Sequence, residues 1–101
     1  MVNVRQRSQE EVRSWADHQI PYLISYWQEL PEIYAELDSW DIGEVQDYVE
    51  EWPLYEMFRR QIEDASQRGV LTPEQEREMD RLRSLVDQHG HLLKELLGHT
   101  N

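Results

Sequence analysis

Apolar residues recur along the chain at intervals of three and four, which is the period of an amphipathic helix. No stretch alternates apolar and polar residues as a strand does, and glycine is scarce. The pattern predicts an all-α fold, a small single-domain bundle of about five or six helices ending in a long C-terminal helix. The predicted helices cover residues 9–19, 21–30, 31–39, 42–51, 53–68 and 73–97.

Helix ends are predicted from capping residues. Ser8, Asp41 and Thr72 are each followed three residues later by Glu or Gln, a spacing typical of a helix N-terminus. Gly69 is expected to end the preceding helix, because glycine readily adopts the left-handed conformation found there. These signals divide a single domain, residues 1–101, into an acidic aromatic part over 8–69 and a long amphipathic helix over 72–97.

The number of helices depends on three internal prolines. Pro21, Pro31 and Pro53 can each stand in the first turn of a new helix, where the missing N–H has little consequence. Alternatively, Pro21 and Pro31 kink one longer helix, because an apolar stripe that includes Val12 and Trp27 continues across both positions. The two readings differ in helix count but not in fold class.

The composition is strongly acidic, with 21 Asp and Glu against 10 Lys and Arg and a formal net charge of −11. This charge argues against direct binding of nucleic acid or of an anionic membrane surface. The absence of cysteine excludes disulfides and thiolate chemistry. The first seven residues do not resemble a secretory leader, and no apolar run is long enough to span a membrane, so we expect a cytoplasmic protein.

Charge and aromatic residues are concentrated in one segment, residues 14–58, which contains no Lys or Arg. Its acids are Asp17, Glu29, Glu32, Glu36, Asp38, Asp41, Glu44, Asp47, Glu50, Glu51 and Glu56. It also holds every aromatic residue of the chain: Trp15, Tyr22, Tyr26, Trp27, Tyr34, Trp40, Tyr48, Trp52, Tyr55 and Phe58. Because no base neutralises these acids locally, a cationic partner would relieve their mutual repulsion.

We therefore expect a partner-binding face rich in carboxylates, with two indoles as anchors. The expected contact residues are Glu32, Glu36, Asp38, Trp40, Asp41, Glu44, Asp47, Glu50, Glu51 and Trp52. The expected role is that of a non-catalytic interaction or regulatory protein that binds a basic protein, such as an inhibitor or antitoxin-like regulator. Two alternatives stay open: a DNA mimic that inhibits a DNA-binding protein, and a simple division into aromatic core and solvated acids.

A second interaction is expected on the C-terminal helix. Leu82, Val86, His89 and Leu93 follow the alternating spacing of a coiled-coil seam. The seam indicates either packing on the rest of the chain or pairing with a second copy as a homodimer.

Catalytic and cofactor signals are lacking. The glycines are isolated, so no phosphate-binding loop is formed, and no serine-hydrolase motif occurs. Asp87, His91 and Glu95 share one predicted helix face, a spacing equally typical of solvated residues. We expect no catalytic residue, no metal and no cofactor.

One short segment, Leu37 to Val45, resembles the Asp-Ser-Leu region of acyl carrier proteins, which are small, acidic and all-helical. The resemblance implies a carrier-like domain in which Ser39 bears phosphopantetheine and Asp38 is the preceding acid. Trp40 stands where that family has an aliphatic residue.

Overall fold

The computed structural model describes residues 8–98, which form three long α-helices and one short 3-10 helix. The elements are α1 (Gln9–Glu36), η2 (Leu37–Ser39), α2 (Ile42–Gln67) and α3 (Pro73–Gly98). The all-α class is confirmed, whereas the prediction of five or six helices is wrong. The first seven residues, on which the lack of a leader was argued, lie outside the described range.

The prolines explain the lower helix count. Pro21 and Pro31 lie inside α1, and Pro53 lies inside α2. Each proline removes one backbone hydrogen bond from its helix. The apolar stripe nevertheless continues through these positions, and it buries Trp27 and Trp52 almost completely. Burial of side chains this large stabilises the continuous helices. This gain exceeds the loss of stability from the single hydrogen bond that each proline removes.

The helix ends predicted from Ser8, Asp41, Gly69 and Thr72 are confirmed, whereas the ends predicted at the internal prolines are wrong. Ser8 and Asp41 each accept a hydrogen bond from the backbone N–H three residues further on, at 3.2 and 2.8 Å. Thr72 and Gln75 form a reciprocal capping box, in which each side chain accepts from the other's backbone N–H at 3.2 and 3.0 Å. Gly69 has a φ of 73°, the left-handed conformation expected after α2.

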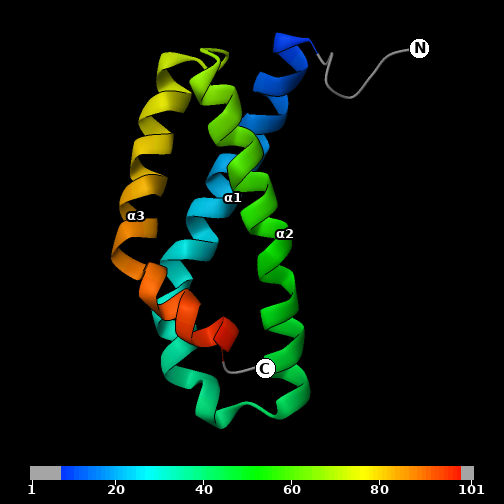
Figure 1. Ribbon diagram of the computed structural model, residues 1–101, viewed down its shortest axis with the longest axis vertical. Coiled ribbons are helices and arrows are strands. Elements are labelled where there is room, and N and C mark those ends of the chain that lie inside the picture. The colour runs from blue at the N-terminus through cyan, green and yellow to red at the C-terminus, as the bar shows by residue number, and fades with distance from the viewer. Residues whose placement is uncertain (1–7, 99–101) are drawn as a thin grey trace, which may run out of the picture.

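The helices run up and down alongside one another (Figure 1), in a flattened molecule with extents of 45 × 32 × 18 Å. α3 packs mainly against α1, and α2 packs on α1 through large aromatic side chains. The buried apolar side chains form one core, to which all three long helices contribute. Its fully buried members include Ile20, Leu23, Trp27, Leu30, Trp52, Ile62, Met79, Leu82 and Leu96.

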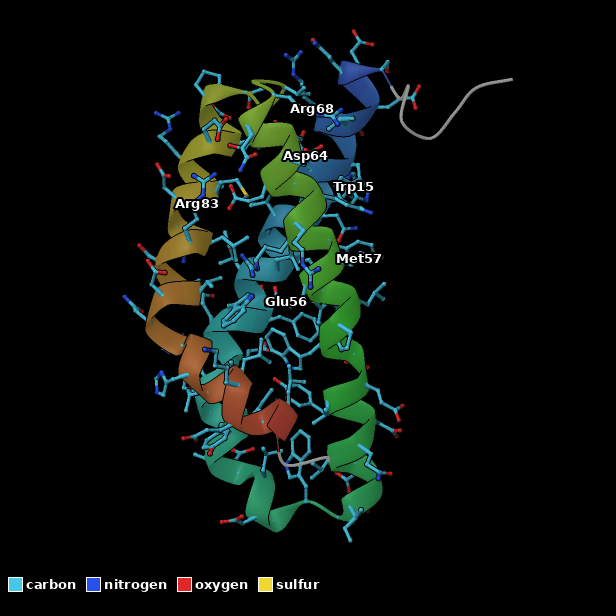
Figure 2. The ribbon with its side chains drawn as sticks, in the orientation of Figure 1. Trp15, Glu56, Met57, Asp64, Arg68 and Arg83 are labelled. Atoms are coloured by element: carbon cyan, nitrogen blue, oxygen red, sulfur yellow. The ribbon has the colours of Figure 1, made fainter. Side chains whose placement is uncertain are left out.

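α2 and α3 are joined chiefly by polar contacts near the loop that connects them. Arg83 Nε donates to both carboxylate oxygens of Glu63, at 3.0 and 3.2 Å, and its guanidinium also reaches Asp80. Ser66 accepts from Arg83 and donates to Glu76. The hydrogen bond from Arg83 lowers the pKa of the Glu63 carboxyl. Figure 2 shows Arg83 on α3 and, on α2, the neighbouring ion pair of Asp64 and Arg68.

Removal of Arg83 is expected to weaken this contact in a pH-dependent way. Because Arg83 is 38% exposed, solvent screens its charge, and we expect Arg83→Met to lower the free energy of unfolding by about 1 kcal/mol at neutral pH. The folded-state pKa of Glu63 is depressed, so its stabilising contribution is present above its unfolded-state pKa and is lost as the pH falls. Urea denaturation should therefore show the variant and wild type converging in acid.

Arg81→Met is the matched control, because Arg81 is an exposed arginine on the same helix. An equal loss in both variants would mean that the pairing with Glu63 contributes nothing to stability.

Candidate partner-binding surface

The acids expected to contact a partner are all exposed. They lie on the second half of α1, on η2 and on the first half of α2, where the chain turns at one end of the molecule (Figure 1). They comprise Glu32, Glu36, Asp38, Asp41, Glu44, Asp47, Glu50 and Glu51. The structure thus gathers these side chains in one half of the fold and leaves them accessible.

The two indoles expected as anchors differ in their placement. Trp40 is half-buried and packs edge-on against Tyr48, with ring centroids 5.8 Å apart. Trp52 is completely buried and contacts the rings of Trp27 and Tyr26. Contact between Trp52 and a partner would therefore require the core to open, so Trp52 acts here as a core residue.

The seam expected on α3 is largely occupied within the chain. Leu82 and Leu93 belong to the core, with exposed fractions of 0% and 6%, while Val86 and His89 are half-buried. Since α3 packs mainly against α1, the seam serves intramolecular packing first. Pairing with a second copy stays a prediction.

Asp41 and Glu44 interact with each other at the start of α2. The backbone N–H of Glu44 donates to Asp41 Oδ1, and this hydrogen bond lowers the pKa of the Asp41 carboxyl. The side-chain contact with Asp41 raises the pKa of the Glu44 carboxyl. Asp41 is therefore both a helix cap and a surface charge, and a substitution there must preserve the cap to test the charge alone.

Charge is segregated along the long axis of the molecule. Residues 22–52 and 86–98, which form one half of the fold, contain eleven Asp and Glu but only one base, Lys94. All eleven carboxylates are exposed. The other described half contains seven arginines among its acids. We call residues 22–52 and 86–98 the acidic half; it carries ten of the thirteen net negative charges of residues 8–98.

A cluster of tyrosines, not identified from sequence, lies at the border of the acidic half, with Tyr22 and Tyr26 inside it and Tyr55 just beyond it. Tyr22, Tyr26 and Tyr55 are in mutual ring contact, with centroids 4.0 to 5.9 Å apart. The hydroxyls of Tyr26 and Tyr55 both donate to Glu51 Oε2, at 3.5 and 3.2 Å. Partial burial, together with the Tyr22 hydroxyl and the Glu51 charge, raises the pKa of Tyr26 to about 12. The phenols therefore stay protonated and hold Glu51 in place.

Tyr22 of this cluster and the adjoining Leu54 are both exposed. Tyr22 is 50% exposed, and Leu54, which follows Glu51 by one turn of α2, is 48% exposed. We call Tyr22, Tyr26, Glu51, Leu54 and Tyr55 the tyrosine patch. The sequence contains one signal for this patch: Leu54 is an apolar residue three positions after Glu51, on the polar side of its helix.

No protein-family model, curated protein or solved structure matches this chain. The role of its surface is therefore inferred from the charge, exposure and contacts of the surface residues.

The described residues offer little to other kinds of site. Among residues 8–98, no group of three or more His, Asp or Glu side chains is placed to hold a metal ion. None of the described helices is long and apolar enough to cross a membrane. Ser39, the residue of the carrier-like segment, ends η2 and donates to the carbonyl of Glu36 at 2.7 Å, while Asp41 rather than Ser39 caps the following helix.

A depression of about 420 Å³ lies between α1 and the first turns of α3. Asp17, Glu74 and Glu78 line it together with Arg77. The side chain of Gln75, at its base, uses its hydrogen-bonding atoms within the chain. Acids and a base are thus mixed here, in contrast to the acidic half.

Proposed function

We propose that this chain is a non-catalytic interaction protein that binds a basic protein through its acidic half. The observation that carries the proposal is the exposure of eleven carboxylates beside a single lysine. Charges within about 10 Å of one another still repel at physiological salt, so this arrangement destabilises the isolated chain. A cationic partner relieves the repulsion and is attracted from a distance.

An inhibitor or antitoxin-like regulator of a basic protein is the role that this surface supports best. Such a partner gains both rate and selectivity from complementary charge. Among residues 8–98, none of the ion pairs involves one of these eleven carboxylates, so they are available to a partner.

Isosteric neutralisation tests the proposal without removing helix caps. The variant Asp41→Asn, Glu44→Gln, Asp47→Asn and Glu50→Gln keeps side-chain size and retains a capping residue at position 41. We expect the immobilised wild-type chain to retain a basic protein from a lysate of its source organism and to release it as salt is raised. The neutralised variant should retain about tenfold less of the same protein, as identified by mass spectrometry.

The control neutralises four exposed acids outside the acidic half: Glu10→Gln, Glu11→Gln, Glu74→Gln and Glu78→Gln. It changes the net charge by the same amount and should retain the partner nearly as well as wild type. If both variants lost the partner equally, net charge alone would explain the binding, and the position of the acids would not matter. Release of the partner by duplex DNA, which a protein-only site resists, would instead favour a DNA mimic.

A further inference from the structure

The tyrosine patch combines accessible apolar surface with fixed negative charge. Tyr22 and Leu54 are each about half exposed although both are large and apolar. Tyr22 lies on α1 and Leu54 on α2. The two helices are in contact here through the rings of Tyr22 and Tyr55, whose centroids are 5.9 Å apart. Tyr and Leu side chains in this setting supply contact area on which a partner can dock.

A second aromatic pair lies between the same two helices, nearer to the start of α1. Trp15 on α1 packs edge-on against Phe58 on α2 at 5.9 Å, and both are half-buried. Figure 2 shows Trp15 on the side of the α1–α2 pair away from α3. Within residues 8–98, no third helix therefore covers this side.

On the side of the patch toward η2 the neighbouring charges are acidic, whereas Arg59, four residues after Tyr55 on the other side, is paired with Glu56. Asp47 precedes Glu51 by four residues and Glu50 precedes Leu54 by four, so each acid lies next to a patch residue on the surface of α2. On α1, Glu29 follows Tyr26 by three residues. The carboxylates of Glu29 and Glu51 both act on Tyr48, whose pKa is raised mainly by burial and further by these two charges. Acids thus lie on both helices beside the tyrosines.

We propose that the tyrosine patch is the docking site for a basic amphipathic helix of the partner. The helix places apolar side chains on Tyr22 and Leu54 and arginines against Glu51 and the neighbouring acids. Arginine suits this position because its guanidinium pairs with a carboxylate and also stacks on a phenol ring. This inference rests on the proposed function and narrows it to one surface and one kind of partner segment.

The dimensions of the site fit a short helix. From Trp15 to Glu29, α1 advances fourteen residues, or about 21 Å. A partner helix of about four turns spans this distance. Its apolar residues would recur at intervals of three and four, the usual arrangement for a helix that lies on a pair of other helices.

The test uses synthetic helical peptides of about four turns, so that no natural partner is needed. The first peptide carries leucines on one face and arginines beside them, the second has glutamine for leucine, and the third has glutamate for arginine. We expect the leucine–arginine peptide to bind the full chain about tenfold more tightly than either of the others, as measured by isothermal titration calorimetry.

Variants of the chain locate the binding site. Tyr22→Ser with Leu54→Ser should weaken binding of the leucine–arginine peptide about tenfold, while Ile42→Ser should change it less than about twofold. Ile42 is the matched control because it is 79% exposed at the start of α2, away from the patch. In the wild-type chain, NMR resonances of Tyr22, Glu51 and Leu54 should shift most, a measurement that stays informative if the double variant unfolds.

The outcomes separate this inference from the proposed function. Tight binding of both arginine peptides, with no effect of the patch substitutions and shifts confined to Asp38 and Asp41, would overturn the tyrosine patch and leave a purely electrostatic acidic half. Equal weak binding of all three peptides would remove support from both.

Discussion

Trp52→Ala is expected to lower the free energy of unfolding by about 3–5 kcal/mol, a large share of the total stability of about 5–15 kcal/mol that is usual for a domain. Trp52 has no exposed surface. Its ring contacts those of Trp27, Tyr48 and Tyr55 at centroid distances of 5.1 to 6.1 Å. Alanine would leave a large cavity between α1 and α2, where few smaller side chains are present to fill it.

Guanidinium denaturation followed by circular dichroism measures the loss. Trp40→Ala is the matched control, because Trp40 is half-buried and makes a ring contact only with Tyr48 among the described residues. We expect its effect to be about half as large or less. A Trp52 variant as stable as the Trp40 variant would contradict the central place of Trp52 in the core.

Gln75→Glu is expected to lower the free energy of unfolding by about 2–3 kcal/mol at neutral pH. Gln75 is 5% exposed, and its Nε2 donates to the carbonyl oxygen of Arg13 at 2.8 Å and to Asp17 Oδ1 at 2.6 Å. Glutamate supplies no donor there and places a second carboxylate beside Asp17. The introduced carboxylate would then face the carbonyl oxygen of Arg13 and the carboxylate of Asp17 in a partly buried contact between α1 and α3, with no donor between them.

The pH dependence of this variant follows from the sign of its pKa shift. The introduced carboxyl is protonated more easily in the folded than in the unfolded chain, because burial and Asp17 raise its folded-state pKa. Its destabilising effect is therefore greatest above that pKa and diminishes as the pH falls. Gln88→Glu, the same change at an exposed position of α3, should alter stability by less than about 0.5 kcal/mol. A Gln75 variant that does not recover in mild acid would contradict this account.

Features of the fold that depend on neighbouring residues were predicted from the sequence. The caps at Ser8, Asp41 and Thr72 require only side chains three residues apart, and the left-handed Gly69 requires only the absence of a Cβ. The helix count was wrong because it depends on tertiary packing. A proline such as Pro53 starts a helix or lies within one according to what the flanking side chains bury, and the burial of Trp52 decides the outcome.

The candidate surface was predicted only in part for a related reason. The acids were expected to be exposed because nothing in residues 14–58 neutralises them, and the structure exposes all of them except Glu56, which pairs with Arg59. The tyrosine patch was missed because Tyr22 and Tyr55 are separated by 33 positions in the chain and their rings come into contact only after α1 and α2 pack. Trp52 was expected at the surface because composition alone does not tell a core indole from an interface indole.

The lengthwise separation of charge gives the molecule a permanent electric dipole moment directed along its 45 Å axis. In the field of an approaching polycation this moment produces a torque, which turns the carboxylate-bearing end forward before any atoms touch. Rotational search, which ordinarily slows the meeting of two specific patches, is shortened accordingly. For the proposed basic partner, the fold would therefore affect the kinetics of encounter as well as the stability of the complex.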